Sequence, residues 1–217
     1  MKKLLLILGV FAVVFVVLNF VNIKSPFSHQ VSNSTNINIK AGSGNLNFNS
    51  SVEKSLLSGY FNHTLLNNIG FTTNANELNL SANKINGEVD LPNNVNISNI
   101  SFVLGAGNLD LNLKGASIND FSITSGASNI KLVLPQDSSS KFTFTIGAGN
   151  LDVVIPINGK LDGVKIISQS LSNMNLGDLW VKTADGIETK DFDKAKITSI
   201  IDLSKGGSVN LTLTPEK

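Results

Sequence analysis

Apolar and polar residues alternate along most of this chain, and one pattern of alternation occurs three times in succession. Each copy is a strand-like run, the sequence Gly-Ala-Gly-Asn or Gly-Ala-Ser-Asn, and a second strand-like run; the copies cover residues 102–113, 123–134 and 144–155. The spacing between successive copies is constant, without an insertion. Self-similarity at a fixed spacing of this length indicates a stacked-repeat architecture. The pattern also occurs at residues 37–48, whose Gly42 precedes Gly105 by three such spacings, and at residues 201–213.

Side chains of a strand point alternately to opposite faces, so the apolar residues of each copy define one inward face. These apolar positions align at the repeat spacing, as Phe102, Ile123 and Phe144 do. A single repeat cannot bury such a face, whereas stacked repeats bury it against their neighbours. The pattern therefore predicts an all-β fold, a single-stranded β-solenoid or β-helix with coils of about 21 residues. The alternative is an antiparallel β-sandwich in which the Gly-Ala-Gly-Asn segments are hairpin loops.

The turn of each copy contributes residues to three further columns. They are an asparagine column (Asn45, Asn108, Asn129, Asn150), a charged column (Asp110, Lys131, Asp152) and a glycine column (Gly105, Gly126, Gly147). Stacked asparagines form hydrogen-bonded ladders, and alternating charges on facing positions attract each other. The glycines are expected to supply backbone dihedral angles that other residues resist. The turn is therefore interpreted as the corner of a coil.

The N-terminus contains an apolar run from Leu4 to Leu18, which Phe20, Val21 and Ile23 extend, preceded by two lysines. As a helix, this run matches the hydrocarbon thickness of a bilayer, and the lysines favour a cytoplasmic N-terminus. The predicted organisation is a signal anchor or transmembrane helix at residues 1–23, a linker at 24–35 and an extracytoplasmic domain at 36–217. A cleaved secretory signal is the alternative, but no small-x-small cleavage pattern follows the run.

Composition removes several classes of function. The charged fraction is 15% and the net charge is +1, so the chain has no excess of basic residues that would attract nucleic acid. All 17 basic residues are lysines, so the chain lacks the guanidinium group with which arginine binds a phosphate or carboxylate through two hydrogen bonds. The chain has no cysteine, and therefore no disulfide, thiolate nucleophile or lipidated cysteine anchor. Its 29 asparagines and 18 glycines favour frequent turns, as in an all-β protein.

The candidate chemistry is weak. A phosphate-binding loop needs a helix after its glycines, and a strand follows here; calcium-binding repeats have a shorter period and an Asp where Leu109 and Leu151 lie. His29 and His63 are expected in solvent-exposed loops, without metal-ligand spacing. Asp191 and Asp193 are the acidic pair on which a polysaccharide-cleaving enzyme would depend.

No catalytic, cofactor-binding or metal-binding residue is therefore assigned. Trp180 and Phe192 are expected to plug the open end of the solenoid core. A patch of exposed aromatic residues for a partner or glycan is the other interpretation of this pair.

The Gly-Ala-Gly-Asn-Leu-Asp sequence at 105–110 and 147–152 resembles bacterial toast-rack domains and the C-terminal domain of LiaF-like proteins, the cell-wall-active antibiotic response proteins. The end of the chain, residues 190–195 with the strand at 197–203 and the Gly206-Gly207 turn, is similar to the closing pattern of that family. The resemblance covers residues 36–214. It implies an envelope-associated β-solenoid without described catalytic residues. LiaF-like proteins generally have several membrane helices before this domain, whereas this chain has one apolar segment.

These observations together predict a non-catalytic, single-pass membrane protein of the bacterial cell envelope. Its solenoid is expected to be a scaffold or protein-interaction module, with a role in envelope stress. The predicted partners are the membrane and an envelope protein or glycan. A secreted adhesin-like or glycan-binding module is the alternative.

Overall fold

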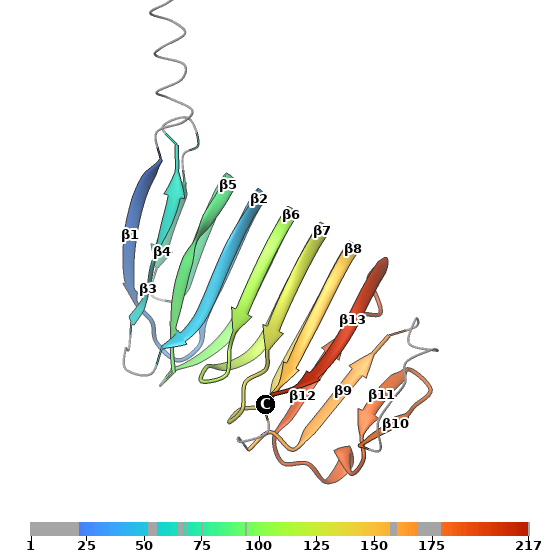
Figure 1. The fold of residues 1–217 in the computed structure, drawn as a ribbon. Helices are drawn as coiled ribbons and strands as arrows, with labels where there is room; N and C mark the ends of the chain where they lie inside the picture. The colour runs from blue at the N-terminus through green and yellow to red at the C-terminus, as the bar shows by residue number, and fades with distance from the viewer. Residues whose placement is uncertain are drawn as a thin grey trace, which may run out of the picture.

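The computed structural model describes residues 22–51, 56–64, 67, 69–74, 76–93, 95–156, 160–168 and 179–216. In these ranges the chain forms thirteen strands and one short 3₁₀ helix (Figure 1). In chain order they are β1 (Ile23–Gln30), β2 (Thr35–Ser51), β3 (Leu56–His63), β4 (Gly70–Asn74), β5 (Glu77–Pro92), β6 (Asn96–Asn112), β7 (Ser117–Val133), β8 (Ser140–Ile155), β9 (Gly163–Ile167), β10 (Trp180–Lys182), β11 (Gly186–Thr189), η1 (Phe192–Lys194), β12 (Thr198–Asp202) and β13 (Ser208–Pro215).

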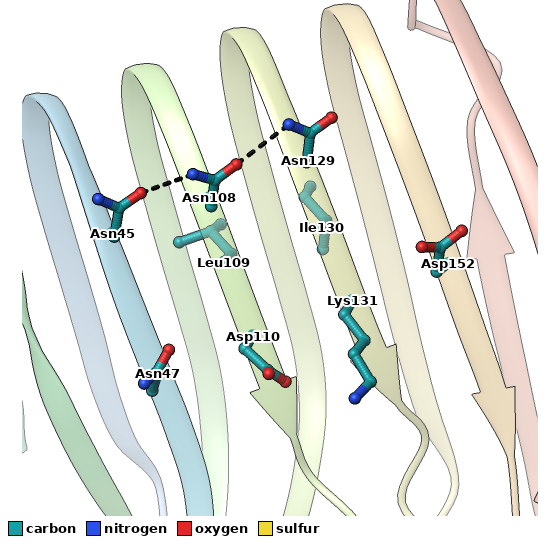
Figure 2. Close-up of a pocket in the computed structure, with 9 residues that line it drawn as sticks. All are labelled: Asn45, Asn47, Asn108, Leu109, Asp110, Asn129, Ile130, Lys131 and Asp152. Atoms are coloured by element: carbon teal, nitrogen blue, oxygen red, sulfur yellow. Dashed lines mark hydrogen bonds between the residues drawn. The ribbon is translucent and has the colours of Figure 1, made fainter.

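Five long strands form the centre of the molecule, in the spatial order β5, β2, β6, β7, β8. All neighbours in this stack are parallel. β2, β6, β7 and β8 each turn over at a segment that contains glycine, so the two halves of each strand lie in opposite layers (Figure 2). The register of β6, β7 and β8 follows the sequence repeat: Asn108 lies beside Asn129, and Asn129 beside Asn150. The fold is therefore all-β and solenoid-like, and the parallel pairing of the copies rules out hairpin loops at the Gly-Ala-Gly-Asn segments.

The stacking order differs from the chain order at both ends of this stack. β2 lies between β5 and β6, so Asn45 pairs with Asn108, three repeat lengths later in the chain, on one edge and with Asn86 on the other. At the opposite end, β12 and β13 stack on β8, and β9 pairs with the outer edge of β12. The copy at residues 37–48 thus stacks in register on the later copies, and β2 and β6 are direct neighbours although three repeat lengths separate them in the sequence.

Antiparallel strands flank both ends of the stack. β3 pairs with β5 and β1 pairs with β3, while β4 pairs with another part of β5. At the other end, β11 joins β9 to β10. The structure thus differs from the expected linker at residues 24–35, because most of β1 lies there. The strand is held by packing as well as pairing, since the ring of Phe27 stacks on that of Phe61 at 4.8 Å.

The core lies between the two halves of the bent strands. The predicted inward residues of the three copies are buried, apart from Ile155, which is half-buried. A row of phenylalanine rings crosses the coils: Phe48 contacts Phe102 at 5.1 Å, Phe102 contacts Phe121 at 5.6 Å, and Phe121 contacts Phe142 at 5.7 Å. Each ring therefore packs against rings from neighbouring coils, as aromatic pairs at such distances do.

The predicted membrane segment falls almost wholly outside the described residues, which begin at residue 22. Its last predicted residue, Ile23, is the first residue of β1. In the part of the chain that the structure describes, no helix has the length and apolar character needed to cross a membrane.

Candidate functional site

The asparagine column forms a continuous hydrogen-bonded ladder. In the described part of the chain, six side-chain amides are joined by hydrogen bonds of 2.7 to 3.3 Å, in which the Nδ2 of one amide donates to the Oδ1 of the amide before it in the stack; in spatial order they are Asn86, which only accepts, Asn45, Asn108, Asn129, Asn150 and Asn210. The predicted ladder of four is confirmed. The sequence interpretation missed Asn86 and Asn210, although each follows an apolar residue in a period-two run, which is the signal that could have found them.

Glycine occupies the three positions of the glycine column for a different physical reason from the predicted one. Gly105, Gly126 and Gly147 have no positive φ angle. Instead, a Cβ atom at Gly105 would lie 2.2 Å from the carbonyl oxygen of Gly42, and one at Gly126 would lie 2.7 Å from that of Gly105. The prediction of special dihedral angles was therefore wrong for these residues. Glycine is needed because the backbones of neighbouring coils come too close for a side chain.

The charged column is aligned but does not form direct ion pairs. Lys131 lies beside Asp110 on one strand and Asp152 on the other. Among the described residues, the ion pairs within 4 Å involve other groups. The predicted alignment of opposite charges is confirmed, but the three charged groups do not form ion pairs within 4 Å of one another. These three side chains are exposed on the outer face of the sheet.

A shallow groove of about 440 Å³ lies between the asparagine ladder and the charged column (Figure 2). We call it the amide groove. Its upper row is Asn45, Asn108 and Asn129, its lower row is Asn47, Asp110, Lys131 and Asp152, and its floor lies at Leu109 and Ile130. The groove crosses β2, β6, β7 and β8 at right angles to the chain direction, so equivalent residues of successive coils line it.

The two histidines lie on strands and not in exposed loops as predicted. Both are half-buried, His29 on β1 and His63 on β3. His63 Nε2 is 2.9 Å from the Oγ of Ser25, which links β3 to β1. In the described ranges, no group of three or more His, Asp or Glu side chains is placed to hold a metal ion.

The acidic pair lies at the η1 helix and is exposed. Asp191 contacts the ammonium group of Lys194 at 2.6 Å, and this hydrogen bond lowers the pKa of the Asp191 carboxyl group. Asp193 precedes that lysine in the same turn. The structure therefore places Asp191 in a local turn contact within this short helix.

The predicted aromatic plug lies at the β9–β11 end of the sheet. Trp180 is half-buried against the core, and the half-buried Phe192 lies against Gly163 and 5.9 Å below the ammonium group of Lys165. Lys165 also contacts Glu188 at 3.1 Å, and this hydrogen bond raises the pKa of the lysine. The packing of Trp180 against the core agrees with a role in covering this end.

A backbone turn is fixed at the same end by one carboxylate. Asp162 accepts hydrogen bonds from the backbone N–H groups of Lys196 and Ile197 at 3.1 and 2.9 Å. These bonds lower the pKa of Asp162. The contact ties the start of β9 to the start of β12, two segments that the sheet places side by side.

The bent parallel strands, the buried phenylalanine row and the amide ladder define a solenoid-like all-β protein whose repeat is structural. The chain belongs to the toast-rack family: residues 20–155 match the N-terminal domain of toast_rack, DUF2154. No curated protein matches the sequence.

Crystal structures of proteins from two other bacteria are among those whose fold matches this chain. A proposed cell adhesion protein of Clostridium sporogenes has 14% sequence identity and a TM-score of 0.64, and the match covers 89% of this chain and all of that chain. A proposed adhesin of Bacteroides fragilis has 12% identity and a TM-score of 0.31 over 89% of this chain and 97% of that chain. The first likeness supports the fold.

Proposed function

We propose that this chain is a non-catalytic, membrane-tethered interaction module of the cell envelope. The observation that carries the proposal is the outer face that contains the ladder. There, successive coils present polar side chains from a backbone that is already paired on both edges in β2, β6, β7 and β8. A rigid, regular polar surface is suited to recognition, because its side chains are ordered before a partner arrives.

The tether is supported by the N-terminal sequence. The apolar run that begins at Leu4 is long enough to span a bilayer as a helix, and Lys2 and Lys3 favour a cytoplasmic N-terminus. The domain is then held on the outer side of the membrane, which is the location that a role in envelope stress requires. The Clostridium sporogenes protein of similar fold is described as a proposed cell adhesion protein, which agrees with an interaction role.

Intact-mass measurement of the full chain, expressed in a bacterium and recovered from its membranes, tests the tether. The expected mass is that of the whole chain, and protease added outside the cells should digest the domain. A protein that has lost about 25 N-terminal residues and is found in the medium would contradict the tether. That result would support the secreted, adhesin-like alternative.

A further inference from the structure

We propose that the amide groove binds a neutral glycan chain that lies across the strands, along the direction in which the coils stack. The inference rests on the proposed function, because it assigns a class of partner to the same outer face. The fold leaves hydrogen-bonding groups of this face unused.

The upper row of the groove keeps half of its hydrogen-bonding capacity. A side-chain amide has two N–H donors and an oxygen with two lone pairs. Asn108 uses one donor on Asn45 and one lone pair on Asn129, at 2.8 and 3.1 Å. Each such amide therefore still has one donor and one acceptor. The ladder bonds fix the orientation of these groups, so successive coils present the same pair of groups to a ligand.

The lower row supplies stronger groups. Among the described residues, Asp110, Lys131 and Asp152 have no ion pair with one another or with other side chains. Their carboxylate and ammonium groups stand beside the groove in alternation. Hydrogen bonds to charged groups are stronger than those between neutral groups. A hydroxyl-rich ligand can donate to the carboxylates and accept from the ammonium group.

The spacing of the groove suits a chain of repeated units. Neighbouring parallel strands lie about 4.8 Å apart, so each coil offers its groups once per step of that length. The two rows are two residues apart along each strand, which is about 6.6 Å. A sugar ring with its hydroxyl groups can contact both rows at this separation, and the step is similar to the length of one sugar residue in an extended glycan.

Charge and backbone pairing decide between classes of partner. On this face of β5, β6, β7 and β8, the carboxylates Glu88, Asp90, Asp110 and Asp152 outnumber the ammonium group of Lys131, so a polyanion such as a phosphate polymer is repelled. An extended peptide adds to a sheet through backbone hydrogen bonds at an edge, and β6 and β7 are paired on both edges. A neutral glycan needs neither a positively charged surface nor a free strand edge.

The test measures binding of a soluble chito-oligosaccharide of N-acetylglucosamine units to the full-length chain in lipid nanodiscs, by isothermal titration calorimetry. The double variant Asp110→Ala/Lys131→Ala removes facing groups from the groove. Its matched control, Asp120→Ala/Lys141→Ala, removes an exposed pair that is aligned in the same way on the outer face of the other layer. We expect binding about tenfold weaker in the first variant, as for the loss of one or two hydrogen bonds, and unchanged binding in the control.

The inference is overturned if the unaltered chain does not bind the oligosaccharide, or if both double variants weaken binding equally. It is also overturned if a poly(glycerol phosphate) chain binds more tightly than the neutral probe. If the chain captures an envelope protein through Asp110 and Lys131 and does not bind the glycan, the result would contradict glycan binding but support the proposed function as an interaction module. Circular dichroism of each variant confirms that the fold is kept.

Discussion

Replacing Gly105 by alanine is expected to lower the free energy of unfolding by about 3 kcal/mol, at the upper end of the cost of overpacking. The new Cβ atom would lie 2.2 Å from the carbonyl oxygen of Gly42, which is a backbone atom of the neighbouring coil. Two coils would have to separate, and their hydrogen bonds would lengthen. Urea-induced unfolding, followed by circular dichroism, measures the change.

The matched control is Gly206→Ala, at the turn of the last coil. A Cβ atom there meets its nearest backbone atom at 3.4 Å, and Gly206 has no positive φ angle. Its cost should therefore stay within about 0.5 kcal/mol, as for most surface substitutions. Equal losses in the two variants would show that close approach between coils is not the reason for glycine at position 105.

Replacing Phe121 by alanine is expected to cost about 3 to 5 kcal/mol, the range for a large aromatic side chain lost from a core. The ring is 1% exposed and packs between Phe102 and Phe142 from the two neighbouring coils. Its loss leaves a cavity that the stacked backbones cannot close, because their spacing is set by the hydrogen bonds of the sheet. The midpoint of urea unfolding should fall accordingly.

Val103→Ala serves as the comparison for this core variant. Val103 lies next to Phe102 but points outward and is 45% exposed. The same kind of truncation should cost less than about 1 kcal/mol there. A small loss at Phe121, similar to that at Val103, would contradict the assignment of inward and outward faces.

The columns of the repeat could be predicted from the sequence because period-two alternation and a constant spacing determine them together. Leu111, Leu132 and Val153 fall in one buried column for this reason. The amide ladder followed from the same alignment. These features depend on local pattern and register, both of which the sequence contains.

The order of the coils could not be predicted, because every copy presents the same columns and fits the edge of any other. β2 lies between β5 and β6, and the strands that follow it in the chain, β3 and β4, do not carry the repeat. The strand at β1 was missed because its alternation is weak, and Phe27 is the apolar residue that ties it to Phe61. The amide groove could not be predicted either, because it lies between two columns on one face and their separation is defined only in the folded coils.

The central claim is that the repeated Gly-Ala-Gly-Asn segment is a structural corner whose asparagines couple neighbouring coils. A double-mutant cycle in urea unfolding tests it most directly, with Asn129→Ala and Asn150→Ala as the adjacent pair, joined at 2.7 Å. We predict a coupling free energy of about 0.5 to 1 kcal/mol for this pair, as for a single hydrogen bond. The pair Asn45→Ala and Asn150→Ala, separated by β6 and β7, should show none. Zero coupling in the adjacent pair would contradict the claim.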